Sequence, residues 1–141
     1  MRLTHETVLE GVAFALREQV APNLTDAFAA DAARMAQSLI TIASRASDDA
    51  AEIRVQENAR IRELLGQGGA LFGDDELTAA AQSNDPSLKI SELDAETGRL
   101  RSLLVGLQTR IERQSTPEAR VLDQAIWQAL RDFETARAPR A

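Results

Sequence analysis

Residues 91–114 read SELDAETGRLRSLLVGLQTRIERQ, and this stretch decides the fold. Its apolar side chains recur at intervals of three, four and seven residues, which places them on one face of a helix: Leu93, Leu100, Leu104, Leu107 and Ile111. We expect Ser91 to cap this helix and the helix to reach about Gln114. An apolar face of this length needs partner helices, which the rest of the chain has to supply.

The next segment of the sequence is expected to form the first partner helix. Thr116-Pro117 is typical of a helix start, because threonine caps the backbone and proline fits the first turn. We expect this helix to continue to about Arg137 with one inward face: Leu122, Ile126, Ala129, Leu130 and Phe133. The short Ser115-Thr116 connection predicts that the two helices form an antiparallel hairpin.

Three more long helices are predicted before residue 66, over residues 5–21, 26–45 and 48–65. Thr4, Thr25 and Ser47 are their expected caps, and Pro22-Asn23 ends the first of them. The second has an apolar stripe at spacings of three and four that we expect to face the core: Phe28, Ala32, Met35, Leu39, Ile42 and Ala43. No Gly or Pro separates the second helix from the third, so one bent helix is the alternative.

Residues 65–90 are expected to join the two helical halves. Gly66-Gln67-Gly68-Gly69 predicts a helix end, and the apolar residues 70–73 that follow predict a loop packed against the bundle. Asp74-Asp75 begins a short helix that reaches about Gln82, and residues 83–87 are rich in turn-forming side chains.

Composition supports an all-α fold. The chain has 141 residues, of which 44% are apolar, and Ala and Leu supply most of these, which favours helices over strands. Its length fits one domain over residues 1–141. We therefore predict a helical bundle of about five long helices and one short one, ending in an antiparallel helical hairpin.

The charge limits the partners. The net charge is -6, which disfavours general binding to nucleic acid or to an anionic membrane. It is uneven, with nets of -1 over residues 1–46, -8 over 47–96 and +3 over 97–141, which predicts that the acidic middle lies near the basic end. Without a signal-like segment or a run of ~20 apolar residues, the expected location is the cytoplasm.

The residues offer little for catalysis. His5 is the only histidine, and the chain has neither Cys nor Tyr, so most triads, zinc sites and di-iron sites are excluded. The glycine-rich segment lacks the Lys-Ser/Thr of a phosphate loop, and Asp74-Asp75-Glu76 follow it where a phosphate would lie. We therefore expect no cofactor, no metal and no catalytic residue, and an enzyme is the less favoured class.

Two aromatic side chains do not fit the core-facing stripes. At 100° per residue, Phe14 lies roughly 160° from the apolar face of its helix, and Trp127 lies about 120° from that of the last helix. A second packing surface within the bundle explains them, and so does a contact surface, because large aromatics are favoured at interfaces. Phe14 and Trp127 are therefore the candidate interface residues of a homodimer.

A charged pair interrupts an apolar face of the third helix. Glu57 projects between Ile53 and Ile61, and Arg60 lies beside it on the same face. An ion pair between Glu57 and Arg60 at the core edge is one interpretation. A carboxylate that lines a pocket is the other.

The first 65 residues resemble a known group of proteins. The stretch from Leu16 to Leu24, with its Val-Ala-Pro break, and the stretch from Phe28 to Ala36 are similar to a family of small uncharacterised bacterial helical proteins. Members are often encoded beside aminoglycoside-phosphotransferase-like kinases or acyl-CoA dehydrogenases. The resemblance implies an accessory role beside an enzyme, and it implies no active-site residues.

Three functions remain open at this point. The first is a non-catalytic accessory or protein-interaction bundle that forms a homodimer. The second is a binding module for a small apolar or acyl ligand held between helices, with Leu71-Phe72 as a lid. The third is a carboxylate-based enzyme around Glu57.

Overall fold

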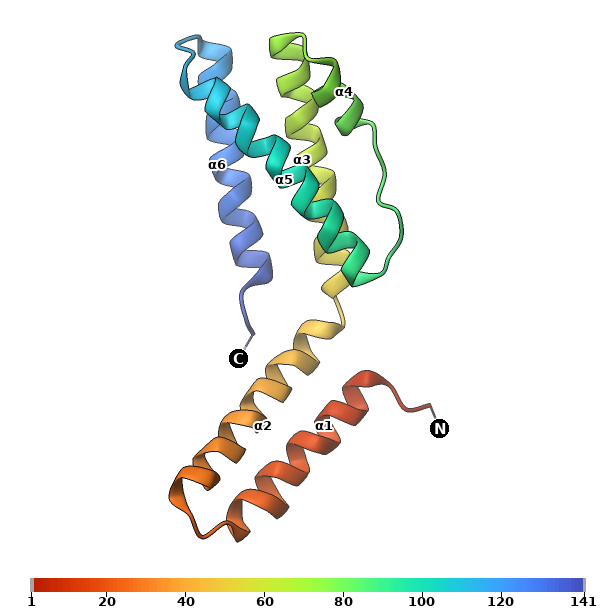
Figure 1. The fold of residues 1–141 in the computed structure, drawn as a ribbon, viewed down its shortest axis with the longest axis vertical. Helices are drawn as coiled ribbons and strands as arrows, with labels where there is room; N and C mark the ends of the chain where they lie inside the picture. The colour runs from red at the N-terminus through yellow and green to blue at the C-terminus, as the bar shows by residue number, and fades with distance from the viewer. Residues whose placement is uncertain (1, 141) are drawn as a thin grey trace. The chain divides into compact units, whose positions relative to one another are not determined.

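The structure is a computed structural model that describes residues 2–140, and its regular elements in that range are all helices (Figure 1). The predicted all-α fold class is therefore confirmed. Contacts group the chain into two compact units, residues 2–50 with 139–140, and residues 51–138. The hydrophobic core cluster lies within the second unit, between Ile61 and Phe133.

The first unit is a helical hairpin. Its elements are α1 (His5–Ala15), a π-helical turn (Leu16–Val20), a 3₁₀ turn (Ala21–Asn23) and α2 (Ala27–Ser47). Thr4 caps α1 as predicted, whereas Asp26 rather than Thr25 caps α2 by accepting a hydrogen bond from the backbone N–H of Ala29 at 2.9 Å. Pro22 has no N–H to donate, which accounts for the change of hydrogen-bond pattern at the end of the first helix.

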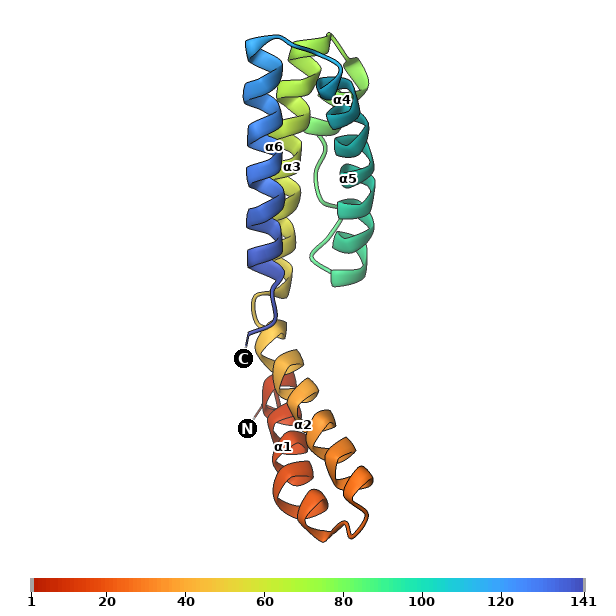
Figure 2. The same ribbon diagram turned by 90° about the vertical axis from the view of Figure 1, so that its left-hand side faces the viewer.

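The second unit holds three long helices and a short one (Figure 2). They are α3 (Ala50–Phe72), α4 (Asp75–Ala81), α5 (Ile90–Glu112) and α6 (Pro117–Arg137). The predicted leucine face of α5 is fully buried, and α5 and α6 form the predicted antiparallel hairpin. The cap of α5 is wrong in the prediction, because Lys89 occupies that position and Ser91 lies inside the helix.

The second and third predicted helices are separate helices. α2 ends at Ser47 and α3 begins at Ala50, so the alternative of one bent helix over both segments is wrong.

The predicted helix end at the glycine-rich segment is also wrong, because α3 continues to Phe72. The glycines serve close packing instead. A Cβ on Gly68 would lie 2.5 Å from Leu107 of α5, and one on Gly69 would lie 2.5 Å from the hydroxyl of Thr78 of α4. The residue after the helix is Gly73, whose φ of 61° lies in the left-handed region that favours glycine.

Candidate functional site

The apolar stripe of α2 faces away from α1. Phe28 is 83% exposed, Met35 66% and Leu39 60%, and of the six stripe residues only Ile42 is half-buried. The expectation that this stripe faces the core is therefore wrong. The buried residues of α2 are Ala30 and Ser44, four turns apart on the opposite side of the helix.

Small and polar side chains explain this inverted arrangement. The α1 residue buried in the hairpin is Ala13, so the buried residues of the two helices are alanines and a serine, and none of them is a large apolar residue. Small side chains let two helix backbones approach closely, but they bury little apolar surface. The hairpin thus leaves several large apolar side chains exposed, and these include Val8 and Val12 of α1 and Val20 of the π-helical turn.

The two candidate interface aromatics are about half exposed. Phe14 is 52% exposed and lines a hollow of about 280 Å³ in the hairpin, where Arg17 and Thr41 are among its neighbours. Trp127 is 49% exposed on α6 of the second unit. Both side chains are thus available for contacts, and each belongs to a different unit.

Glu57 is buried and forms ion pairs, but not with the predicted partner. The side chain of Arg60 pairs with Glu63 at 2.8 Å instead. The two oxygens of Glu57 accept hydrogen bonds from Arg101 Nε at 2.7 Å and from Arg137 Nε at 2.6 Å. The predicted Glu57–Arg60 pair is therefore wrong, and the real pairs join α3 to α5 and α6.

Sequence spacing could not find these partners, because Arg101 and Arg137 lie 44 and 80 positions from Glu57. The guanidinium of Arg101 also lies 5.8 Å from the ring centroid of Phe133, within reach of a cation–π contact. The interpretation of Glu57 as a pocket residue has some support, since Glu57 and Arg60 both line a hollow of about 210 Å³.

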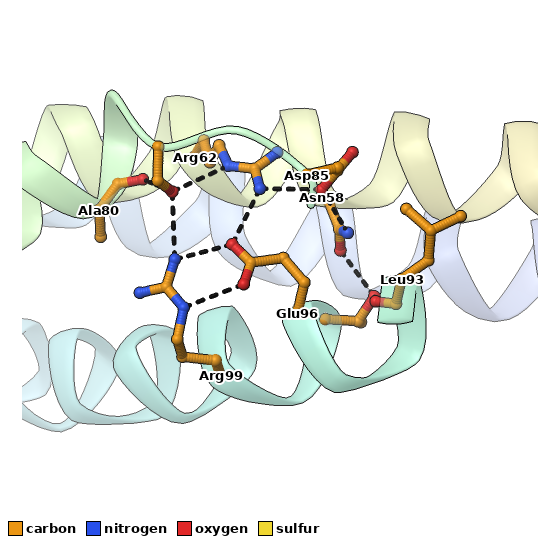
Figure 3. A network of polar contacts seen from close by, with 9 residues as sticks. Asn58, Arg62, Ala80, Asp85, Leu93, Glu96 and Arg99 are labelled. Carbon is orange, nitrogen blue, oxygen red and sulfur yellow. Dashed lines mark hydrogen bonds and ion pairs between the residues drawn. The ribbon is translucent and has the colours of Figure 1, made fainter. Parts of the chain in front are cut away.

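A second polar network fastens the segment between α4 and α5 (Figure 3). Arg62 Nη2 donates to Asp85 Oδ1 at 2.8 Å and to Glu96 Oε1 at 2.9 Å. Arg99 donates to both oxygens of Glu96, at 2.7 and 3.0 Å. The Arg99 guanidinium, and after it Arg62, holds the pKa of the Glu96 carboxyl below its usual range, against the opposing effect of burial.

Two neutral side chains, those of Asn58 and Thr97, extend this network into the buried interior. Asn58 is fully buried, and its side-chain amide donates to Asp85 at 2.9 Å. The hydroxyl of Thr97 donates to the Asn58 oxygen at 2.6 Å. The charges of the network's two arginines and two carboxylates cancel. We therefore interpret the network as structural, since it holds the segment between α4 and α5 against the helices.

Asp74 joins two roles at the start of α4. Its carboxylate accepts from the backbone N–H of Leu77 at 3.1 Å, which caps the helix, and from Arg110 Nη1 at 2.5 Å. The Leu77 N–H, and after it Arg110, lowers the pKa of Asp74 below its usual range. The Arg110 guanidinium also lies 4.3 Å from the ring centroid of Phe72, so Arg110 ties the end of α3 to α5.

An open apolar hollow of about 640 Å³ lies between the end of α3 and the start of α6. Its lining is Gln67, Ala70, Leu71, Pro117, Glu118, Val121 and Leu122. The prediction that Leu71 and Phe72 form a loop is wrong, because they are the last residues of α3, and this removes the basis for a loop lid. Leu71 nevertheless lines the hollow from its rigid helix.

Residues 2–140 contain no cluster of three or more His, Asp or Glu side chains placed to hold a metal ion. Over the same range, none of the helices combines the length and the apolar character needed to cross a bilayer.

Comparisons with protein-family models, with curated proteins and with solved structures give no match. The resemblance of the first 65 residues to a bacterial family thus stays a prediction.

Proposed function

We propose that the chain is a non-catalytic protein-interaction bundle that works as a homodimer, in an accessory role beside an enzyme. The observation that carries this proposal is the exposed apolar stripe of α2, above all Phe28, Met35 and Leu39. Fully burying a large apolar side chain is favourable by about 1.5–3 kcal/mol of free energy. A stripe of several such residues therefore favours a partner surface over water.

The large aromatics Phe14 and Trp127 are the second set of proposed contact residues. Large aromatic side chains supply much of the binding energy at interfaces, and both are about half exposed. Because they lie in different units, they can serve different contacts, for example one with a second copy and one with a neighbouring enzyme.

Native mass spectrometry on untagged protein, purified gently from its own host, tests the proposal. A mass of two chains, twice 15.3 kDa, supports the homodimer, and a stoichiometric second protein identifies the accessory role and its client. A mass of one chain at all concentrations contradicts it. The variant carrying both Phe14→Ala and Trp127→Ala shows whether the aromatics contribute: a fall to one chain assigns the dimer contact to them.

A binding module for a small apolar or acyl ligand is the second candidate, and the 640 Å³ hollow beside Leu71 favours it. A medium-chain fatty acid is a suitable probe, because the hollow is mainly apolar. Ligand binding should raise the melting temperature of the wild type but not of Val121→Arg, which fills the entrance from an exposed position. If the melting temperature of neither protein changes, this candidate is excluded.

A carboxylate-based enzyme around Glu57 is the weakest of the three. Both carboxylate oxygens of Glu57 already accept hydrogen bonds from arginines on two other helices. That arrangement suits a structural ion pair better than a general acid or base, which needs an oxygen within reach of a substrate.

A further inference from the structure

The exposed face of α2 carries a heptad repeat. Six residues follow one another at alternating spacings of four and three, and we call them the α2 seam: Phe28, Ala32, Met35, Leu39, Ile42 and Ala46. Five of them are exposed and Ile42 is half-buried. A repeat of 3.5 residues is the pattern with which one helix packs against another in a coiled coil, so the natural partner of the seam is a helix.

We infer that this partner is α2 of a second copy, and that the two helices pair antiparallel around residue 37. This inference rests on the proposed homodimer and assigns it a surface and an orientation. The sizes of the seam side chains favour this orientation. Antiparallel pairing sets Phe28 against Ala46 of the second copy, Ala32 against Ile42, and Met35 against Leu39, so that the largest side chain meets one of the smallest.

Parallel pairing lacks this complementarity. It sets each seam residue against itself, with Phe28 on Phe28 at one layer and Ala32 on Ala32 at the next. Two large side chains then hold the helices apart where two alanines leave a void. Voids of that kind cost packing energy, so the seam disfavours the parallel arrangement.

The charges on the flanks of the seam also favour the antiparallel pair. One flank carries Asp31, Ser38 and Arg45, seven residues apart, and the other carries only alanines: Ala29, Ala36 and Ala43. In an antiparallel pair like flanks face each other, so Asp31 of one copy meets Arg45 of the other, twice per dimer. A parallel pair would set these charges against alanines and leave them unmatched.

The local contacts allow this pairing. Asp31 accepts from Arg34 of its own helix through Oδ1 at 2.9 Å, and a carboxylate can accept from a second guanidinium through its other oxygen. The alanine flank lets the two helices approach closely, as the alanines do where α1 meets α2. The net charge of -1 over residues 1–46 adds little repulsion between two copies.

Two paramagnetic labels test the orientation in the full chain, which has no cysteine of its own. The variants Ser38→Cys and Ser47→Cys replace exposed serines of α2 that lie outside the seam. Antiparallel pairing offsets the two Ser38 positions by about 3 Å along the helix axis and the two Ser47 positions by about 30 Å. Dipolar EPR then measures a short distance for the first variant and a long one for the second, and sedimentation on the same samples gives the mass.

Each other outcome overturns the inference in its own way. Equally short distances in both variants mean parallel pairing, and a two-chain mass with a long Ser38 distance means a dimer formed through another surface. Both of these results leave the proposed homodimer standing. A one-chain mass without dipolar coupling removes the inference and the homodimer together.

Discussion

Phe28 is 83% exposed, whereas Ala30, two residues further along α2, is 6% exposed. The two side chains lie roughly 200° apart around the helix, so Ala30 faces α1 and the large apolar groups on the side of Phe28 face outward. A hairpin that needed only to fold would gain by the reverse arrangement. This inversion is the reason to regard the outer face of α2 as a binding surface.

Gly69→Ala is expected to lower the free energy of unfolding by about 1–3 kcal/mol, because its Cβ would press on backbone atoms of the α4 turn. The backbone nitrogen of Thr78 and the carbonyl oxygen of Asp74 lie 3.0 and 3.2 Å from that Cβ position. Gly98→Ala is the matched control in α5, where nothing lies within 4 Å, and it should stabilise by about 0.5–1 kcal/mol. Urea unfolding measures both, and equal midpoints for the two variants would refute the close-packing role.

Glu57→Gln is expected to cost about 1–3 kcal/mol, because it leaves Arg101 and Arg137 without the charge between them. The value is below that of a fully buried pair, since both guanidinium side chains are about one-third exposed. Glu63→Gln, which breaks an exposed pair on the same helix, should change stability by no more than about 0.5 kcal/mol. Unchanged stability in Glu57→Gln would instead revive a catalytic role for this carboxylate.

Stability should depend on pH through Glu96. Its pKa is lowered in the folded state, first by Arg99 and then by Arg62, so the ionised form stabilises the fold above the ordinary pKa. That stabilisation is lost as the pH falls through the lowered pKa. The melting temperature of the wild type should therefore exceed that of Glu96→Gln near pH 7, and the difference should shrink below about pH 4. A difference that grows on acidification would contradict this account.

Local patterns predicted the second unit well. The leucine face of α5, the Thr116-Pro117 start of α6 and the start of α4 at Asp74-Asp75 all follow from interactions within a few residues of each other, and spacing rules capture such interactions. The end of α3 was missed because a glycine pattern alone does not distinguish a helix stop from a close contact with another helix. Only the positions of Leu107 and Thr78 show which one applies.

The candidate site was harder to predict, since its contacts join residues that are distant in sequence. The partners of Glu57 come from two other helices, whereas spacing offered only the neighbouring Arg60. The stripe of α2 was recognised correctly as one apolar face, but the rule that such a face points to the core assigned it inward. The signal available in the sequence was the small Ala30 on the side of the helix opposite Phe28. A face of small residues can mark a close contact between helices, just as a face of large apolar residues can.

The most direct test of the account is the mass in solution of the wild type, of Leu39→Asp and of Val105→Asp. Leu39 and Val105 are both apolar and similarly exposed, but only Leu39 lies on the α2 seam. Sedimentation equilibrium should give two chains, twice 15.3 kDa, for the wild type and for Val105→Asp, and one chain for Leu39→Asp with unchanged helicity. A wild type of one chain, or a Leu39→Asp variant that keeps the mass of two, would contradict the claim that α2 forms the dimer interface.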